Sequence, residues 1–195
     1  LEKIKAIKDR KEYQRVTAEL DRKGESTMMY AWGVGADQRN AGNNIVAISQ
    51  AGLGLGTPEY YLNEDPQSKA VVAAYKTYLT KLFQLVGYDA ETAAKKVEAV
   101  MEIENRIAKV SYDQVKRRDI NANYHKLTYA ELIEQYPGID WPTVFWVSGF
   151  PVFNEVDLGQ PEPIHEVEKI LADTDLDNLK SYAEIRIIAG ASSCM

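Results

Sequence analysis

Two long amphipathic stretches joined by a short link constrain the fold of this chain more than any other feature. The first opens at Asp65-Pro66, where Asp suits the helix N-cap and Pro suits the first helical position. Apolar residues then recur at helical spacing over 66–86. Asp89 is a second N-cap, and the same periodicity continues over 89–110. Because only Gly87-Tyr88 separates these two predicted helices, we expect them to pack antiparallel.

Between residues 28 and 49 the pattern becomes typical of β structure. Residues 28–36 are apolar and aromatic and contain glycine, and residues 44–49 are rich in β-forming types. A polar, turn-forming segment, 37–43, lies between them. We therefore predict a β-hairpin over about 28–49 with a long loop.

The rest of the chain is predicted to be helical. Thr128-Tyr129-Ala130-Glu131 and Thr174-Asp175-Leu176-Asp177 fit the capping box that opens a helix, and the segment 149–161 is expected to be a loop. We see no repeat, low-complexity segment or linker between domains. The prediction is a mainly α fold, a single multi-helix lobe over 1–195 with one β-hairpin. Its other helices are expected over about 1–23, 128–136, 140–148, 162–172 and 174–189.

Composition excludes several classes of partner. The 23 Lys and Arg residues are outnumbered by 29 Asp and Glu, which gives a net charge of −6. A nucleic-acid backbone is therefore excluded as partner, because phosphate neutralisation needs a basic face. No apolar run approaches the roughly 18 residues of a membrane span. Cys194 is the single cysteine, so we expect no internal disulfide. One cysteine fits a reducing compartment, and it equally fits a bacterial envelope protein that has no disulfides.

Both ends of the chain are expected to be cut points of a longer protein. The chain begins inside a charged helical pattern and ends on Ala191-Ser192-Ser193-Cys194-Met195. A piece separated from its neighbour should expose an apolar surface, so we also expect possible self-association through that surface.

Five short blocks stand out by their order and spacing: Gln50-Ala51-Gly52-Leu53-Gly54-Leu55, Glu59-Tyr60-Tyr61-Leu62, Arg117-Arg118-Asp119, Tyr124-His125-Lys126 and Ile139-Asp140-Trp141. Together they resemble the neprilysin family of zinc metallopeptidases, which includes enzymes of the endothelin-converting type. The resemblance covers most of the chain, over 25–188. The family's Leu-Pro before its Tyr-Tyr pair is replaced here by Gly56-Thr57-Pro58-Glu59, so the local turn is expected to differ.

The resemblance implies that the chain is part of the N-terminal helical region of a secreted, periplasmic or cell-envelope zinc endopeptidase; a cytoplasmic location stays open. In this family such a region faces the catalytic lobe across a chamber that admits peptides and excludes folded proteins. The catalytic lobe holds one zinc through two His and one Glu, and a further Glu acts as the base. The expected partners are therefore that lobe of the same chain and the parent's peptide substrates.

No segment here carries the His-Glu-x-x-His motif, in which two imidazoles one helical turn apart hold the zinc. We therefore predict no catalytic residue, no metal ligand and no cofactor in this chain. The chain alone should be inactive, and zinc is expected in the full-length parent. His165-Glu166 begins like the motif, but Lys169 stands where the second imidazole would be. Acidic residues in a first helical turn are common, so the main interpretation of this segment is a solvated helix start. The other histidine, His125, is expected to have a structural role.

Seven residues are predicted to be structural, whereas the substrate-binding residues cannot be assigned. Gly52 and Gly54 resemble a nucleotide-binding glycine loop, yet no βαβ unit follows. The favoured interpretation is a tight backbone passage covered by Tyr60 and Tyr61. Four aromatic residues at helical spacing are expected in the core rather than on a chamber wall: Tyr75, Tyr78, Trp141 and Phe145. Arg118 and Asp119 are expected to form an ion pair that clamps a loop between helices. The seven structural residues are Gly52, Gly54, Tyr60, Tyr61, Arg118, Asp119 and Trp141.

Two other functions remain open at this point. One is a stand-alone helical protein-interaction domain with no enzymatic parent. The other is a domain that binds a small ligand or a metal through His125 or His165.

Overall fold

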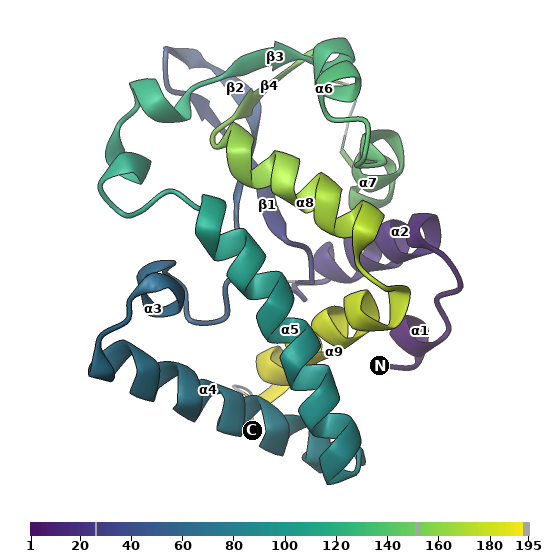
Figure 1. Cartoon of the computed structure of the whole chain (residues 1–195). Coiled ribbons are helices and arrows are strands. Elements are labelled where there is room, and N and C mark those ends of the chain that lie inside the picture. Colours follow the sequence, from purple (N-terminus) through teal and green to yellow (C-terminus); the bar gives the residue numbers. More distant parts are fainter. Residues whose placement is uncertain (26, 151–152, 193–195) are drawn as a thin grey trace.

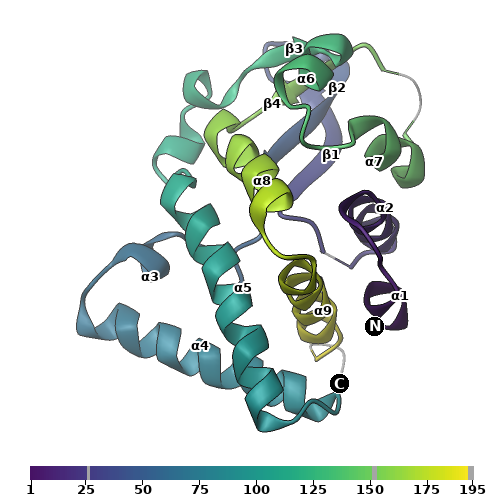
Figure 2. The ribbon, with the colours of Figure 1, turned by 45° about the vertical axis from the view of Figure 1, so that its right-hand side comes forward.

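The computed structural model describes residues 1–25, 27–150 and 153–192, and Cys194 lies outside this range. Helices gather around a long central helix, α5 (Ala90–Val110), which crosses the molecule in both Figure 1 and Figure 2. It contacts α4, α8 and α9, and the residues of its inner stripe, including Val97, Val100 and Ile103, are buried. The fold is mainly α with a small sheet, which confirms the predicted fold class.

Helix α4 (Pro66–Leu85) precedes α5, and both begin at the predicted caps, Asp65 and Asp89. The two helices run in opposite senses but diverge from their connection (Figures 1 and 2), and α3 (Glu59–Leu62) contacts both of them. Their burial explains the divergence, because the buried apolar residues of α4 lie near its C-terminal end at Leu79, Leu82 and Phe83. Placing Tyr78 in the core was wrong, since its side chain is 43% exposed.

The hairpin is present as β1 (Tyr30–Asp37) and β2 (Asn40–Gln50). The predicted long loop was wrong, because pairing continues through the polar residues to Asp37 and Asn40. Only Gln38 and Arg39 form the turn, and the Asp37 side chain accepts the Arg39 N–H at 2.9 Å. Polar residues can continue a ladder whose pairing depends on backbone groups rather than on side-chain type.

Two further strands complete a four-stranded sheet of order β1-β2-β4-β3. Strand β4 (Glu155–Leu158) pairs parallel with β2 and antiparallel with β3 (Lys126–Thr128). The expectation of an uninterrupted loop over 149–161 was therefore wrong in its second half. The four-residue strand forms because Val156 and Leu158 bury their side chains in the sheet beside Val46 and Ile48.

The single N-terminal helix predicted over 1–23 was also wrong. The structure has α1 (Glu2–Lys5) and α2 (Arg10–Asp21), separated at Asp9. The Asp9 side chain accepts the backbone N–H of Glu12 at 2.8 Å and so caps a new helix start. The break lets Ile4 and Ile7 bury their side chains in the core.

Most of the C-terminal half is helical. Thr128 and Glu131 form the predicted capping box of α6. The box predicted at Thr174 is not formed, because Asp175 accepts the backbone N–H of Asp177 and the helix begins at Leu176.

No helix in the described ranges is both long enough and apolar enough to cross a bilayer. The remaining helices are α6 (Tyr129–Gln135), α7 (Trp141–Ser148), α8 (Pro161–Asp173), α9 (Leu176–Ser192) and the short 3-10 helices η1 (Lys116–Arg118) and η2 (Asn121–Asn123).

Candidate functional site

The glycine-rich loop, residues 52–56, follows β2 and passes closely over α5 and α9. Gly52 has a φ of +97°, a conformation that favours glycine. A Cβ at Gly52 would lie 2.8 Å from the Tyr182 hydroxyl and 3.1 Å from the Ile107 side chain. The Tyr182 hydroxyl, buried on α9, donates a 2.9 Å hydrogen bond to the Gly52 carbonyl. Only a residue without a side chain fits this close approach.

A buried carboxyl group holds the next part of the loop. Glu104 on α5 is fully buried, and its Oε1 accepts the Gly54 N–H at 3.2 Å. The Tyr75 hydroxyl donates to the same oxygen at 3.0 Å, and the Tyr61 hydroxyl donates to Oε2 at 2.7 Å. Tyr61 also accepts the Leu55 N–H at 3.0 Å. The carboxyl group therefore joins the loop to α3, α4 and α5.

The electrostatics of this group follow from its burial. Loss of solvation raises the pKa of Glu104, while hydrogen bonds from Tyr61 and Tyr75 and the charge of Arg186 act in the opposite direction. Burial, followed by the adjacent Glu104 charge, raises the pKa of Tyr61 and of Tyr75 well above the usual range. Both tyrosines therefore stay neutral donors at physiological pH, as a structural network requires.

The predicted aromatic cover of the loop is only partly the one observed. Tyr61 contributes to it as expected, whereas Tyr60 is 36% exposed. Tyr75 and Tyr182 supply the rest of the cover from α4 and α9. The tight backbone passage expected at Gly52 and Gly54 is present.

The predicted clamp between Arg118 and Asp119 is not formed. Across the described residues, no ion pair joins Arg117 or Arg118 to Asp119. Asp119 instead accepts the backbone N–H groups of Asn121 and Ala122, as expected for an Asp that stabilises its own turn. The short 3-10 helix leaves the basic side chains exposed.

Trp141 has the packing role that was expected. It is fully buried, and its indole N–H donates to the Tyr136 carbonyl at 3.0 Å. Its ring stacks on Phe145 with centroids 5.7 Å apart and lies 5.4 Å from the Tyr30 ring. This cluster joins α7 to the first strand of the sheet.

Both histidines are engaged in local contacts. The Nδ1 of His125 lies 2.9 Å from the Leu158 carbonyl. The His165 ring stacks on Tyr136 with centroids 4.4 Å apart, and its Nδ1 lies 3.0 Å from Glu168 Oε2. Within the described ranges, no group of three His, Cys, Asp or Glu residues could hold a metal ion. These residues do not fit the zinc of the neprilysin family.

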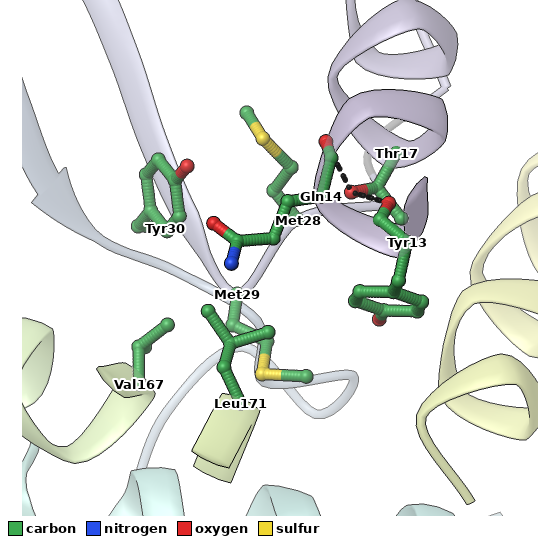
Figure 3. Close-up of a pocket in the computed structure, with 8 residues that line it drawn as sticks. All are labelled: Tyr13, Gln14, Thr17, Met28, Met29, Tyr30, Val167 and Leu171. Carbon is green, nitrogen blue, oxygen red and sulfur yellow. Dashed lines mark hydrogen bonds between the residues drawn. The ribbon is translucent and has the colours of Figure 1, made fainter. Parts of the chain in front are cut away.

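A small cavity lies where α2, α8 and the start of β1 meet (Figure 3). It measures about 20 Å³, which is room for about one water molecule and not for a peptide. Its walls are mostly apolar, and the buried Tyr13 hydroxyl has no hydrogen-bond partner among the described residues. We interpret it as a packing defect between elements. The lining residues are Tyr13, Gln14, Thr17, Met28, Met29, Tyr30, Val167 and Leu171.

Sequence reasoning missed Glu104 and Tyr182, and it placed Tyr75 only in the core. One signal for Glu104 was available, because it lies at helical spacing from Met101 and Ile107, on the apolar stripe of its own helix. A carboxyl group on such a stripe needs buried donors, since an unpaired buried charge is strongly unfavourable.

Comparison with known proteins agrees with this architecture. The family model described as Peptidase family M13 matches residues 1–195. Bovine endothelin-converting enzyme 1 is 32% identical over 167 residues, a match that covers 82% of this chain and 22% of that enzyme. The chain therefore spans about a fifth of the length of this relative.

Solved structures show the same fold. The Mycobacterium tuberculosis zinc metalloprotease Zmp1 in its open state matches with a TM-score of 0.88 at 27% identity, covering 94% of this chain and 28% of that one. PepO from Lactobacillus rhamnosis matches with a TM-score of 0.79 at 18% identity, which shows the fold alone. The chain belongs to peptidase family M13, the neprilysin family, and corresponds to an N-terminal region of its zinc metallopeptidases.

Proposed function

We propose that this chain is the non-catalytic helical lobe of a zinc endopeptidase that hydrolyses small peptides, and that it covers the catalytic chamber and limits substrate size. The observation that carries the proposal is the similarity to the zinc metalloprotease Zmp1 over 94% of the chain. The family membership favours this function over a stand-alone interaction domain.

The buried network around Glu104 supports the proposed role, because a cover that excludes folded proteins must keep its shape. The glycine-rich loop is held on one side by Glu104 and on the other by Tyr182. Side chains from α3, α5 and α9 therefore bond this backbone segment directly, and Tyr75 on α4 supports it through Glu104. We expect the segment to act as a rigid wall rather than as a mobile lid.

The parent's location is proposed to be the cell envelope, the periplasm or the extracellular space. The catalytic lobe of the same polypeptide is the proposed main partner, and zinc is proposed to be bound there.

Substrate size is the direct test. The full-length parent should be assayed on a short peptide, on a folded protein and on the same protein unfolded. We expect cleavage of the peptide and little cleavage of the folded protein. The variant Gly54→Ala, which distorts the wall, should raise cleavage of the larger substrates relative to the peptide, whereas Gly35→Ala, where a Cβ meets open space, should not. Equal kcat/KM values for the peptide and the folded protein in the wild-type enzyme would refute the size-limiting role.

A further inference from the structure

A groove with acidic walls lies at the C-terminal end of α5. Figures 1 and 2 show this end of α5 between α3 and the start of α8, and α5 contacts both helices. The volume of the groove is about 500 Å³, which is room for a long side chain. We call it the acidic groove. It is lined by residues that include Glu59, Leu62, Val110, Asp113, Lys116 and Glu162.

The acidic groove has a negative charge that no ion pair compensates. The carboxylates of Glu59, Asp113 and Glu162 line it against the single ammonium group of Lys116, which leaves a net charge of −2. Among the described residues, none of these three carboxylates forms an ion pair with a Lys, Arg or His side chain. The groove therefore attracts a cation.

Lys116 balances only one of the three carboxylates. The Tyr112 hydroxyl donates a 2.5 Å hydrogen bond to Glu162, and the Lys116 ammonium group lies 3.4 Å from the centroid of the Tyr112 ring. The hydrogen bond from Tyr112, together with the nearby charge of Lys116, lowers the pKa of Glu162. Lys116, Tyr112 and Glu162 thus form one balanced wall, and the uncompensated charge belongs to Glu59 and Asp113.

Glu59 gives an independent reason to expect a cationic ligand. Its Oε2 atom is buried and has no hydrogen-bond partner among the described residues. Such an oxygen is unfavourable, because it has lost its contact with water without gaining a donor. The charge of a carboxylate is shared by its two oxygens, so a cation bound at this group would offset that cost.

The apolar part of the lining fits a cation that is carried on an aliphatic stem. Leu62 is 47% exposed and Val110 is half-buried, and both line the same groove as the carboxylates. The stem of a lysine or arginine side chain can pack on apolar surface while its charged end stays among polar groups. Within the described ranges, no group of three His, Cys, Asp or Glu residues could hold a metal ion, so the geometry favours an organic cation.

We propose that the acidic groove binds a lysine or arginine side chain of a peptide substrate. The aliphatic stem lies on Leu62 and Val110, and the charged end lies at Glu59 and Asp113. The inference rests on the proposed function, because it names a feature of the substrates that the same lobe would recognise. Binding of this side chain strengthens the association of the substrate and takes no part in the cleavage itself.

Paired peptide substrates of the full-length parent test the proposal. In each pair one position carries either lysine or norleucine, which has a similar stem and no charge, and this position moves along the peptide from pair to pair. At one position at least, we expect lysine to lower KM about fivefold relative to norleucine, since a partly exposed ion pair is worth up to about that factor. The kcat should be similar within the pair, because the contact is present in the ground state and in the transition state alike.

Two double variants of the parent show whether the acidic groove causes this preference. Glu59→Gln/Asp113→Asn keeps the shape of the side chains and removes two charges, and should reduce the preference for lysine to less than about 1.5-fold. The control Glu102→Gln/Glu134→Gln removes two charges at exposed positions outside the groove and should keep the preference within about 1.5-fold of the wild-type value.

Three outcomes would overturn the proposal: no preference for lysine at any position, the same preference in the wild type and in the groove variant, or an equal loss in the control. Absence of the preference together with a lower Tm for the groove variant than for the control would mean that the groove holds a basic side chain of the catalytic lobe, which also overturns it. None of these outcomes affects the proposed function, because cleavage of the norleucine peptides and sparing of folded proteins are measured separately.

A single substitution keeps the test decisive if circular dichroism shows that the groove variant is unfolded. Asp113 is exposed, and its Oδ1 accepts the backbone N–H of Lys116, a bond that asparagine can also accept. Asp113→Asn should therefore stay folded and lower the preference for lysine by about twofold. An unchanged preference in this variant would equally overturn the proposal.

Discussion

Replacing Gly54 with alanine tests the Glu104 network at the point where it is most tightly packed. A Cβ at this position would lie 1.8 Å from the Tyr75 hydroxyl oxygen, 2.6 Å from its Cζ and 3.0 Å from Glu104 Oε1. Tyr75 must therefore withdraw, and the 3.0 Å hydrogen bond that it donates to Glu104 is lost. The 3.2 Å bond from the Gly54 N–H to the same oxygen is strained at the same time.

The expected magnitude follows from the two bonds. Each hydrogen bond to a buried carboxyl group contributes about 1–3 kcal/mol, so Gly54→Ala should lower the free energy of unfolding by about 2–5 kcal/mol. For a chain of this length that corresponds to a fall in Tm of roughly 10 °C. Because total stabilities are about 5–15 kcal/mol, the effect is a large share of the whole.

Urea denaturation followed by circular dichroism measures this difference. Gly35→Ala is the matched control, since a Cβ there meets nothing within 4 Å, and its effect should stay within about 0.5 kcal/mol. In a Tyr75→Phe background the alanine at position 54 should be better tolerated, because the nearest clashing atom is gone. A loss below about 1 kcal/mol for Gly54→Ala in the wild-type background would refute the description of this network.

Further substitutions test other contacts. Lys96→Met leaves the buried Glu184 carboxylate without its cation and should reduce the free energy of unfolding by about 3 kcal/mol. Lys95→Met, at an exposed pair, should change it by less than about 0.5 kcal/mol. Equal effects of the two variants in urea denaturation would contradict the burial of the Lys96–Glu184 pair. Thr128→Ala removes the capping box of α6 and should reduce the free energy of unfolding by about 1 kcal/mol. An unchanged free energy of unfolding would contradict a stabilising role of this box. Burial raises the pKa of Asp21 to about 6, above its ordinary value of 3.8. The folded state therefore binds this proton more tightly than the unfolded state does. The stability that this tighter binding contributes is present below pH 4 and is lost as the pH rises through 6. The difference in stability between wild type and Asp21→Asn should change over that window, and a constant difference would contradict the raised pKa.

The helix boundaries that depend on neighbours in the sequence could be predicted. Asp65, Asp89 and Thr128 each cap the helix that they were expected to cap. Asp9 carries the same chemistry, but the charged periodicity on both sides of it concealed the break between α1 and α2. Local signals therefore identify a cap well only where the flanking pattern also changes.

The contacts between distant segments could not be predicted. Strand β4 is four residues long and forms because it meets β2, more than a hundred residues earlier in the chain. The Glu104 network likewise joins residues that no local pattern links, since Gly54 and Tyr75 lie 50 and 29 positions before it. The glycines themselves suggested a close approach, but the residues on the other side of that approach became visible only in three dimensions.

The central claim is that this chain is the part of a zinc endopeptidase that performs no chemistry. The most direct test compares the purified 195-residue chain with the full-length parent, measuring bound zinc per chain and hydrolysis of a short peptide with zinc added. We expect one zinc and steady turnover in the full-length protein, and neither in the 195-residue chain. Stoichiometric zinc bound tightly by the shorter chain and lost in His125→Ala or His165→Ala, or peptide hydrolysis by that chain alone, would contradict the claim.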